Sequence, residues 1–126
     1  MRRLTDAVLL AAFMRRLGEE RGAAGRVYFT GGATAVLMGW RSTTIDIDIK
    51  LDQDAERLLQ AIPFLKEELR INVELASPDD FIPELPGWRD RSLFIAREGS
   101  IDFFHYDFYA QALAKLERAH TLDLID

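Results

Sequence analysis

The chain has 126 residues, a net charge of −5, 48% hydrophobic residues, 29% charged residues and no cysteine. This length and composition are typical of one globular domain, and the lack of cysteine excludes disulfides, thiolate zinc sites and cysteine nucleophiles. The acidic balance disfavours a broad basic surface for nucleic-acid backbone, although a local patch for a nucleotide or RNA stays open.

We expect no membrane-spanning segment in this sequence. The longest apolar run, residues 7–14, is short, whereas crossing a bilayer takes about 20 apolar residues. Arginines follow this run where a signal-peptide cleavage site would need small residues, so a secretory leader is not expected either. These features indicate a cytoplasmic protein.

Hydrophobic periodicity predicts that the chain begins with a helix. This helix starts at an N-cap residue, Thr5, and ends by Gly22. The next predicted elements are a strand at residues 26–30, a short helix at 33–38, a strand at 44–51 and a helix at 53–69 that is bent or restarted at Pro63. The strand at 44–51 alternates throughout, and the residues predicted on its buried face are Ile45, Ile47, Ile49 and Leu51.

The second half of the sequence predicts three more strands and a last helix. The strands lie at residues 71–76, 92–97 and 100–104, and the last two form a hairpin. The strand at 71–76 alternates, with Ile71, Val73 and Leu75 predicted on its buried face. Between the first and second of these strands lie a capped turn at residues 77–80 and an ordered loop at residues 81–90 that Trp88 anchors. The last helix begins at about Asp107.

The order of these elements predicts the α/β (α+β) class, with a mixed sheet of about five strands flanked by helices. We expect one domain over residues 1–126. The pattern is still helical at Asp126, which leaves open whether the domain continues beyond this residue.

Two aspartates on the strand at residues 44–51 are the first candidates for chemistry. Asp46 and Asp48 are two residues apart, so both carboxylates point to the polar face of the strand, roughly 7 Å from each other. Mg²⁺ takes oxygen ligands and binds one or two carboxylates together with substrate phosphates. The alternative is a solvated polar face, on which Lys50 offsets part of the charge. The pair alone does not decide between these interpretations.

A glycine pair, Gly31 and Gly32, lies between the strand at 26–30 and the short helix. Free backbone N–H groups at such a turn can bind a phosphate, and glycine lets the phosphate approach the backbone. A side chain at Gly32 is therefore expected to block a phosphate without disturbing the fold. The alternative is a tight turn that binds no ligand. A phosphate cradle next to an aspartate pair is more specific than either feature alone.

Taken together, residues 30–35 (TGGATA) and 43–49 (TTIDIDI) resemble the signature of the nucleotidyltransferase (DNA polymerase β) superfamily. Within that superfamily the pattern is similar to the AbiEii-type and related bacterial nucleotidyltransferases of toxin–antitoxin loci. The C-terminal segment, Lys115 followed by residues 123–126 (DLID), resembles the last helices of these proteins. The resemblance covers most of the chain, but its specific motifs lie within residues 30–49.

The resemblance implies a nucleotidyltransferase fold and a site for Mg²⁺ or Mn²⁺ with a nucleoside triphosphate. Asp46 and Asp48 would bind the metal. The residues that would contact the triphosphate are Gly31, Gly32, Arg41, Ser42 and Lys115. A third carboxylate, from a neighbouring strand, would complete the metal and catalytic set.

Two residues are candidates for the third carboxylate. Asp102 is favoured because it interrupts the apolar strand at 100–104, where a lone charge needs a partner. Glu74, on the alternating strand at 71–76, is the alternative, although a solvent-facing position would explain it equally well.

Three readings of function remain open at this point. The first is a metal-dependent enzyme that transfers a nucleoside monophosphate to an RNA end such as tRNA, or to a protein such as a cognate toxin or antitoxin. The second is a catalytically reduced module on the same fold that binds a nucleotide or a partner. The third is a structural domain in which the motif is accidental.

Overall fold

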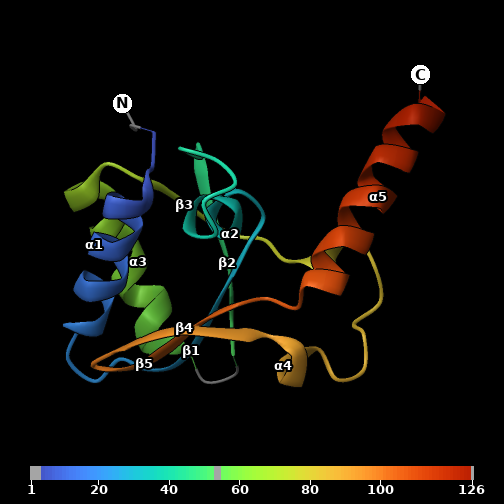
Figure 1. Cartoon of the computed structure of the whole chain (residues 1–126). Helices are drawn as coiled ribbons and strands as arrows, with labels where there is room; N and C mark the ends of the chain where they lie inside the picture. Colours follow the sequence, from blue (N-terminus) through green and yellow to red (C-terminus); the bar gives the residue numbers. More distant parts are fainter. Residues whose placement is uncertain (1–3, 53–54, 126) are drawn as a thin grey trace.

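Helices cover both faces of a five-stranded mixed sheet in the computed structural model, which describes residues 4–52 and 55–125 (Figure 1). The strands are β1 (Ala24–Thr30), β2 (Asp46–Leu51), β3 (Asn72–Leu75), β4 (Leu93–Glu98) and β5 (Ser100–His105), arranged in the order β3-β2-β1-β5-β4. The helices are α1 (Ala7–Gly18), α2 (Gly31–Leu37), α3 (Glu56–Leu69), α4 (Trp88–Arg91) and α5 (Phe108–Ile125), with a 3₁₀ turn, η1 (Pro78–Asp80). The predicted fold class is confirmed.

The main core lies between the sheet and α1 with α3, which run side by side over one face (Figure 1). Central strand β1 pairs antiparallel with β2 and parallel with β5. Its residues Val27 and Phe29 point into this core, where Phe29 stacks on Phe103 with ring centres 5.8 Å apart. Because side chains alternate along a strand, Tyr28 points to the other face.

A smaller aromatic core covers that other face where α4 and α5 meet the sheet. Trp88 of α4 stacks on Tyr106 with ring centres 4.5 Å apart, and Tyr28 meets Trp88 edge-on at 4.9 Å. The prediction that Trp88 anchors its loop is confirmed, because this side chain is buried. The loop also ends in a helical turn, α4, that the pattern did not indicate.

The ends of several elements differ from the sequence prediction. Helix α1 is capped by Asp6, whose carboxylate accepts from the N–H of Leu9 at 2.8 Å, and not by Thr5. Thr5 instead forms an isolated antiparallel bridge with Thr44. Helix α3 runs through Pro63 without a restart. The predicted capped turn is confirmed, since the N–H of Ser77 donates to Asp80 at 2.9 Å.

Two apolar residues that the alternation assigned to the buried faces are exposed. Ile45 lies just before β2 and is 68% exposed, whereas Ile47 and Ile49 are fully buried. Leu75 ends β3, an edge strand, and is 59% exposed. In both cases the hydrophobic alternation reaches the end of a strand, where the side chain is left uncovered. Among the described residues, no helix is both long and apolar enough to cross a membrane.

We predict that Ile47→Ala and Ile45→Ala have very different effects on stability. Ile47→Ala should lower the free energy of unfolding by about 2–5 kcal/mol, because it leaves a cavity in the main core. Ile45→Ala, two residues away, should change it by less than about 0.5 kcal/mol. Urea denaturation of both variants measures the difference. Similar losses would show that Ile45 is buried against another surface.

Candidate active site

Three carboxylates and one amide gather on one face of β2 and β3 because these strands are parallel neighbours. The register pairs Asp46 with Asn72, and Asp48 with Glu74. Residues two apart on a strand share a face, so the four side chains form one set. We call Asp46, Asp48, Asn72 and Glu74 the acidic group. Glu74, the alternative third carboxylate, is thus the one that lies beside the predicted pair.

Asp48 is next to both other carboxylates of this group and is short of stabilising partners. Its Oδ1 atom is buried and has no hydrogen-bond donor among the described residues. Burial, and then the negative charges of Glu74 and Asp46, raise the pKa of Asp48 to about 6, while Arg118 of α5 acts in the opposite direction. A buried carboxylate oxygen with like-charged neighbours is stabilised by a cation. Carboxylate oxygens are also the kind of ligand that Mg²⁺ and Mn²⁺ take.

Asn72, which the sequence patterns did not single out, links two of the carboxylates. Its Nδ2 donates to Oδ1 of Asp46 and, at 3.2 Å, to Oε1 of Glu74. The Asn72 amide thus occupies carboxylate oxygens that a metal ion would use as ligands. Within residues 4–52 and 55–125, no three His, Asp or Glu side chains are grouped so as to hold a metal ion. Coordination of one ion by all three carboxylates of the acidic group would therefore require side chains of the group to move.

The glycine turn, Gly31 and Gly32, lies next to the acidic group. Gly31 has a φ of +59°, and a Cβ at this position would be 3.3 Å from Oδ2 of Asp48. The N–H of Gly31 does not point to solvent but donates to Oε1 of Gln111 on α5 at 2.9 Å. The structure thus brings the predicted phosphate cradle and the aspartate pair together, with a side chain of α5 in contact with the cradle.

Gly32 has a packing reason to be glycine. A Cβ at this position would lie 2.1 Å from Oγ1 and 2.9 Å from Cβ of Thr44. No real contact is that short, so any side chain at residue 32 forces the turn or Thr44 to move. The expectation that a side chain here leaves the fold undisturbed is therefore wrong.

Asp102, the favoured third carboxylate, lies away from the acidic group. It is opposite Arg26 on β1, whereas Asp48 is opposite Thr30 on the same strand. Four residues along a strand span roughly 13 Å. The charge of Asp102 does have a partner, as predicted, but this partner is Arg97 on the other strand of the hairpin, with Nη1 at 3.1 Å from both carboxylate oxygens.

The other predicted triphosphate contacts lie at different distances from the turn. Nη1 of Arg41 is 3.5 Å from the position that a Cβ of Gly32 would take, so this arginine borders the turn. Ser42 follows it in the same loop and is exposed. Lys115 is exposed on α5, and helical spacing places it on the same face as Gln111.

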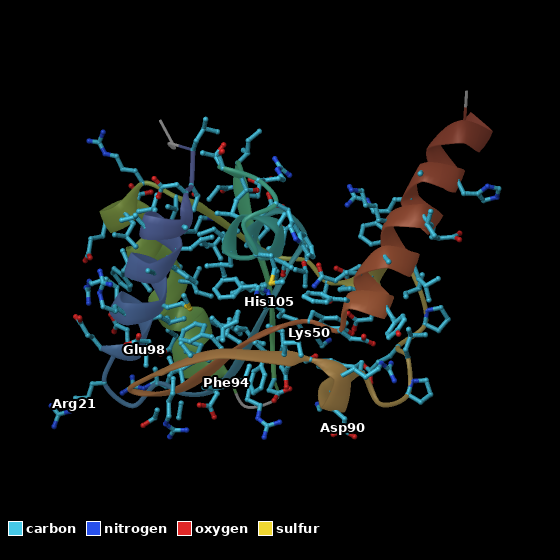
Figure 2. The ribbon with its side chains drawn as sticks, viewed as in Figure 1. Arg21, Lys50, Asp90, Phe94, Glu98 and His105 are labelled. Atoms are coloured by element: carbon cyan, nitrogen blue, oxygen red, sulfur yellow. The ribbon has the colours of Figure 1, made fainter. Side chains whose placement is uncertain are left out.

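Lys50 does not offset the charge of the aspartate pair, which was the alternative interpretation of the polar face. Its Nζ atom lies 2.8 Å from Oδ2 of Asp79 in η1 (Figure 2). This ion pair joins β2 to the turn that packs against α5. The Asp46–Asp48 pair is therefore left without that lysine as a counter-charge.

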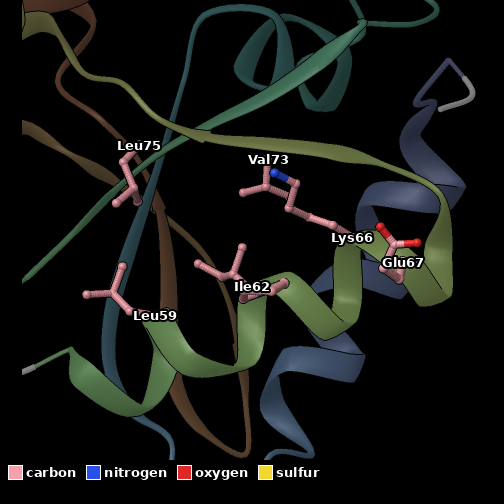
Figure 3. A pocket seen from close by; sticks show the side chains of 7 residues that line it. Leu59, Ile62, Lys66, Glu67, Val73 and Leu75 are labelled. Atoms are coloured by element: carbon pink, nitrogen blue, oxygen red, sulfur yellow. The ribbon is translucent and has the colours of Figure 1, made fainter. Parts of the chain in front are cut away.

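A groove of about 330 Å³ lies on the opposite face of β3, between this strand and α3 (Figure 3). Val73 and Leu75 line it from β3, and Leu59 and Ile62 from α3. Because side chains alternate along β3, these residues point away from Asn72 and Glu74. The groove is therefore separate from the acidic group.

Comparison with protein-family models, with curated proteins and with solved structures finds no match for this chain. Its function must therefore be inferred from the geometry of the acidic group and the glycine turn.

We predict that Gly32→Ala destabilises the fold through Thr44. The steric conflict should lower the free energy of unfolding by about 1–3 kcal/mol. Thr44→Ala removes Oγ1, so the double variant should be more stable than the sum of the two single losses by about 0.5 kcal/mol or more. Urea denaturation of the four proteins of this cycle measures the coupling. Strict additivity would show that residue 32 does not press on Thr44.

The raised pKa of Asp48 predicts a pH-dependent effect of Asp48→Asn. Below about pH 4 this carboxyl is protonated in both the folded and the unfolded chain, whereas above about pH 6 the folded chain must hold it charged. The charge thus destabilises the fold increasingly between these pH values. Asp48→Asn should raise the melting temperature in EDTA at pH 8 and change it little at pH 4. A gain independent of pH would contradict this.

Proposed function

We propose that this chain is a cytoplasmic, metal-dependent nucleotidyltransferase that takes a nucleoside monophosphate from a nucleoside triphosphate. The observation that carries the proposal is the position of Asp48. It is the neighbour of two further carboxylates, Asp46 on the same strand and Glu74 on β3, and lies next to the backbone of Gly31. A triphosphate could use both features, because its oxygens can coordinate a cation held by the carboxylates and can accept hydrogen bonds from the backbone N–H groups of the turn. The resemblance of residues 30–49 to the nucleotidyltransferase signature supports the same activity.

The acidic group and a triphosphate are both negatively charged, so a cation between them would be needed for the reaction. A bound Mg²⁺ or Mn²⁺ would supply charge neutralisation and alignment for phosphoryl transfer. Asp46, Asp48 and Glu74 would hold the cation, and Arg41 and Lys115 would approach the phosphates from either side of the glycine turn. The acceptor hydroxyl oxygen then bonds to the α-phosphorus and its proton passes to Glu74. The bond from the α-phosphorus to the bridging oxygen breaks, and pyrophosphate leaves.

We propose that the acceptor is either an RNA end, such as that of tRNA, or the side chain of a partner protein. The resemblance to nucleotidyltransferases of toxin–antitoxin loci allows both acceptors. The net charge of −5 favours an acceptor held through a few local contacts over one held along an extended phosphate backbone.

A catalytically reduced binding module is the second candidate, and two contacts favour it. Asn72 takes carboxylate oxygens of Asp46 and Glu74, and Gln111 takes the N–H of Gly31. A module of this kind would bind a triphosphate or a partner without completing the three-carboxylate arrangement that transfer needs.

Glu74→Gln and Asp102→Asn separate these candidates and test the assignment of the third carboxylate. Both changes remove one charge and keep the shape of the side chain. Glu74→Gln should lower transfer about 100-fold or more, the usual loss when a proton acceptor is removed, whereas Asp102→Asn should leave it unchanged. The assay follows each of the four labelled nucleoside triphosphates, with Mg²⁺ or Mn²⁺, into total tRNA and into cell-lysate proteins.

Each other result of this comparison has its own meaning. Loss of transfer in Asp102→Asn alone would return the third role to Asp102. Binding of labelled triphosphate without transfer by the unmodified protein would favour the binding module. If the unmodified protein neither binds nor transfers any nucleotide, the proposed function is wrong.

A further inference from the structure

Helix α5 contacts the glycine turn through one side chain and carries a second whose charge acts on the acidic group. Gln111, in the second turn of α5, accepts the N–H of Gly31 at 2.9 Å. Two turns further along, Arg118 acts on the charge of Asp48 and also lies over the ring of Phe81 at 4.9 Å. Gln111 and Arg118 are seven residues apart, which places them on the same face of the helix.

Neighbouring groups fix the orientation of the Gln111 amide. Its Nε2 donates to the carbonyl oxygen of Tyr106 at 2.8 Å and approaches Oγ1 of Thr34 at 3.4 Å. A flipped amide would place its oxygen against the carbonyl of Tyr106, so the oxygen must face Gly31. Thr34 is itself held by the carbonyl of Phe29 at 3.1 Å and by the ring of His105, buried beneath α2, at 3.1 Å (Figure 2).

The contact made by Gln111 is the one that a phosphate oxygen would make. In each case an oxygen accepts the Gly31 N–H. Oδ2 of Asp48 lies close to this turn, 3.3 Å from the position that a Cβ of Gly31 would take. A phosphate and the Gln111 side chain cannot use this N–H fully at the same time, so they compete. Two turns further along the helix, the positive charge of Arg118 acts on Asp48 in the same direction as a bound cation would.

We propose that α5 is an autoinhibitory latch in which Gln111 must release Gly31 before a triphosphate can bind. The inference rests on the proposed function, because it assumes that the glycine turn receives phosphate. The latch and a purely structural role of Gln111 predict opposite changes in ligand affinity when the Gln111 contact is removed. Loss of a structural contact weakens binding, whereas loss of a competing contact strengthens it.

The test measures binding of inorganic tripolyphosphate with Mg²⁺ by calorimetry, so that the identity of the base does not matter. Gln111→Ala and Gln111→Met both remove the oxygen that accepts from Gly31, and methionine keeps the length of the side chain. Each should tighten binding about three- to tenfold, the equivalent of one net hydrogen bond. Leu116→Ala is the matched control on α5, since this side chain is 66% exposed and makes no part of the latch.

A second measurement follows α5 directly in the unmodified protein. If tripolyphosphate displaces Gln111, amide hydrogen exchange in residues 108–112, the part of α5 that carries Gln111, should speed up on binding. Exchange that slows or stays constant there, while the ligand binds, would overturn the latch. Melting temperatures of the variants confirm that binding is compared between folded proteins.

The outcomes separate the latch from the proposed function. If the unmodified protein binds tripolyphosphate and both Gln111 variants bind it equally or more weakly, the latch is wrong and the proposed function stands. If neither the unmodified protein nor either folded Gln111 variant binds tripolyphosphate, the proposed function fails and the latch fails with it. Equal tightening in Leu116→Ala would also overturn the latch, because loosening of α5 in general would then be the cause.

Discussion

The two-residue period of the central strand β1 is the constraint on which the rest of the structure depends. Val27 and Phe29 point into the main core under α1 and α3, while Tyr28 points into the aromatic core under α4 and α5. A shift of one residue in the pairing of β1 would exchange these faces and expose both cores. The antiparallel register that opposes Thr30 to Asp48 is therefore fixed by burial on both faces, and with it the place of the acidic group next to the glycine turn.

That placement brings negatively charged carboxylates together, and polar groups of the same chain offset part of their repulsion. Asn72 bridges Asp46 and Glu74, and Arg118 offsets the charge of Asp48. None of these contacts is part of the main core. The acidic group is thus held by polar contacts on one face of β2, whereas Ile47 and Ile49 on the other face are fully buried.

The sequence predicted the elements well because alternation and helical periodicity report which face of an element is buried. It predicted the fold class, the Asp46–Asp48 pair and the adjacent glycine turn for the same reason. Periodicity does not report which strands are neighbours, so the sequence could not show which of Asp102 and Glu74 lies beside the aspartate pair. Only the parallel pairing of β2 with β3, and the distance along β1, place Glu74 beside Asp48. Gln111 left no local signal, since its partner Gly31 is 80 positions earlier in the chain.

These long-range contacts also explain why a motif of a few residues is weak evidence for activity. The two glycines have different roles. Gly32 is required by packing against Thr44, whereas Gly31 has a left-handed φ and donates its N–H to Gln111 of α5. A backbone N–H needs an acceptor, and Gln111 supplies one here. Whether the helix shares that N–H with a ligand decides between a packing turn and a phosphate cradle.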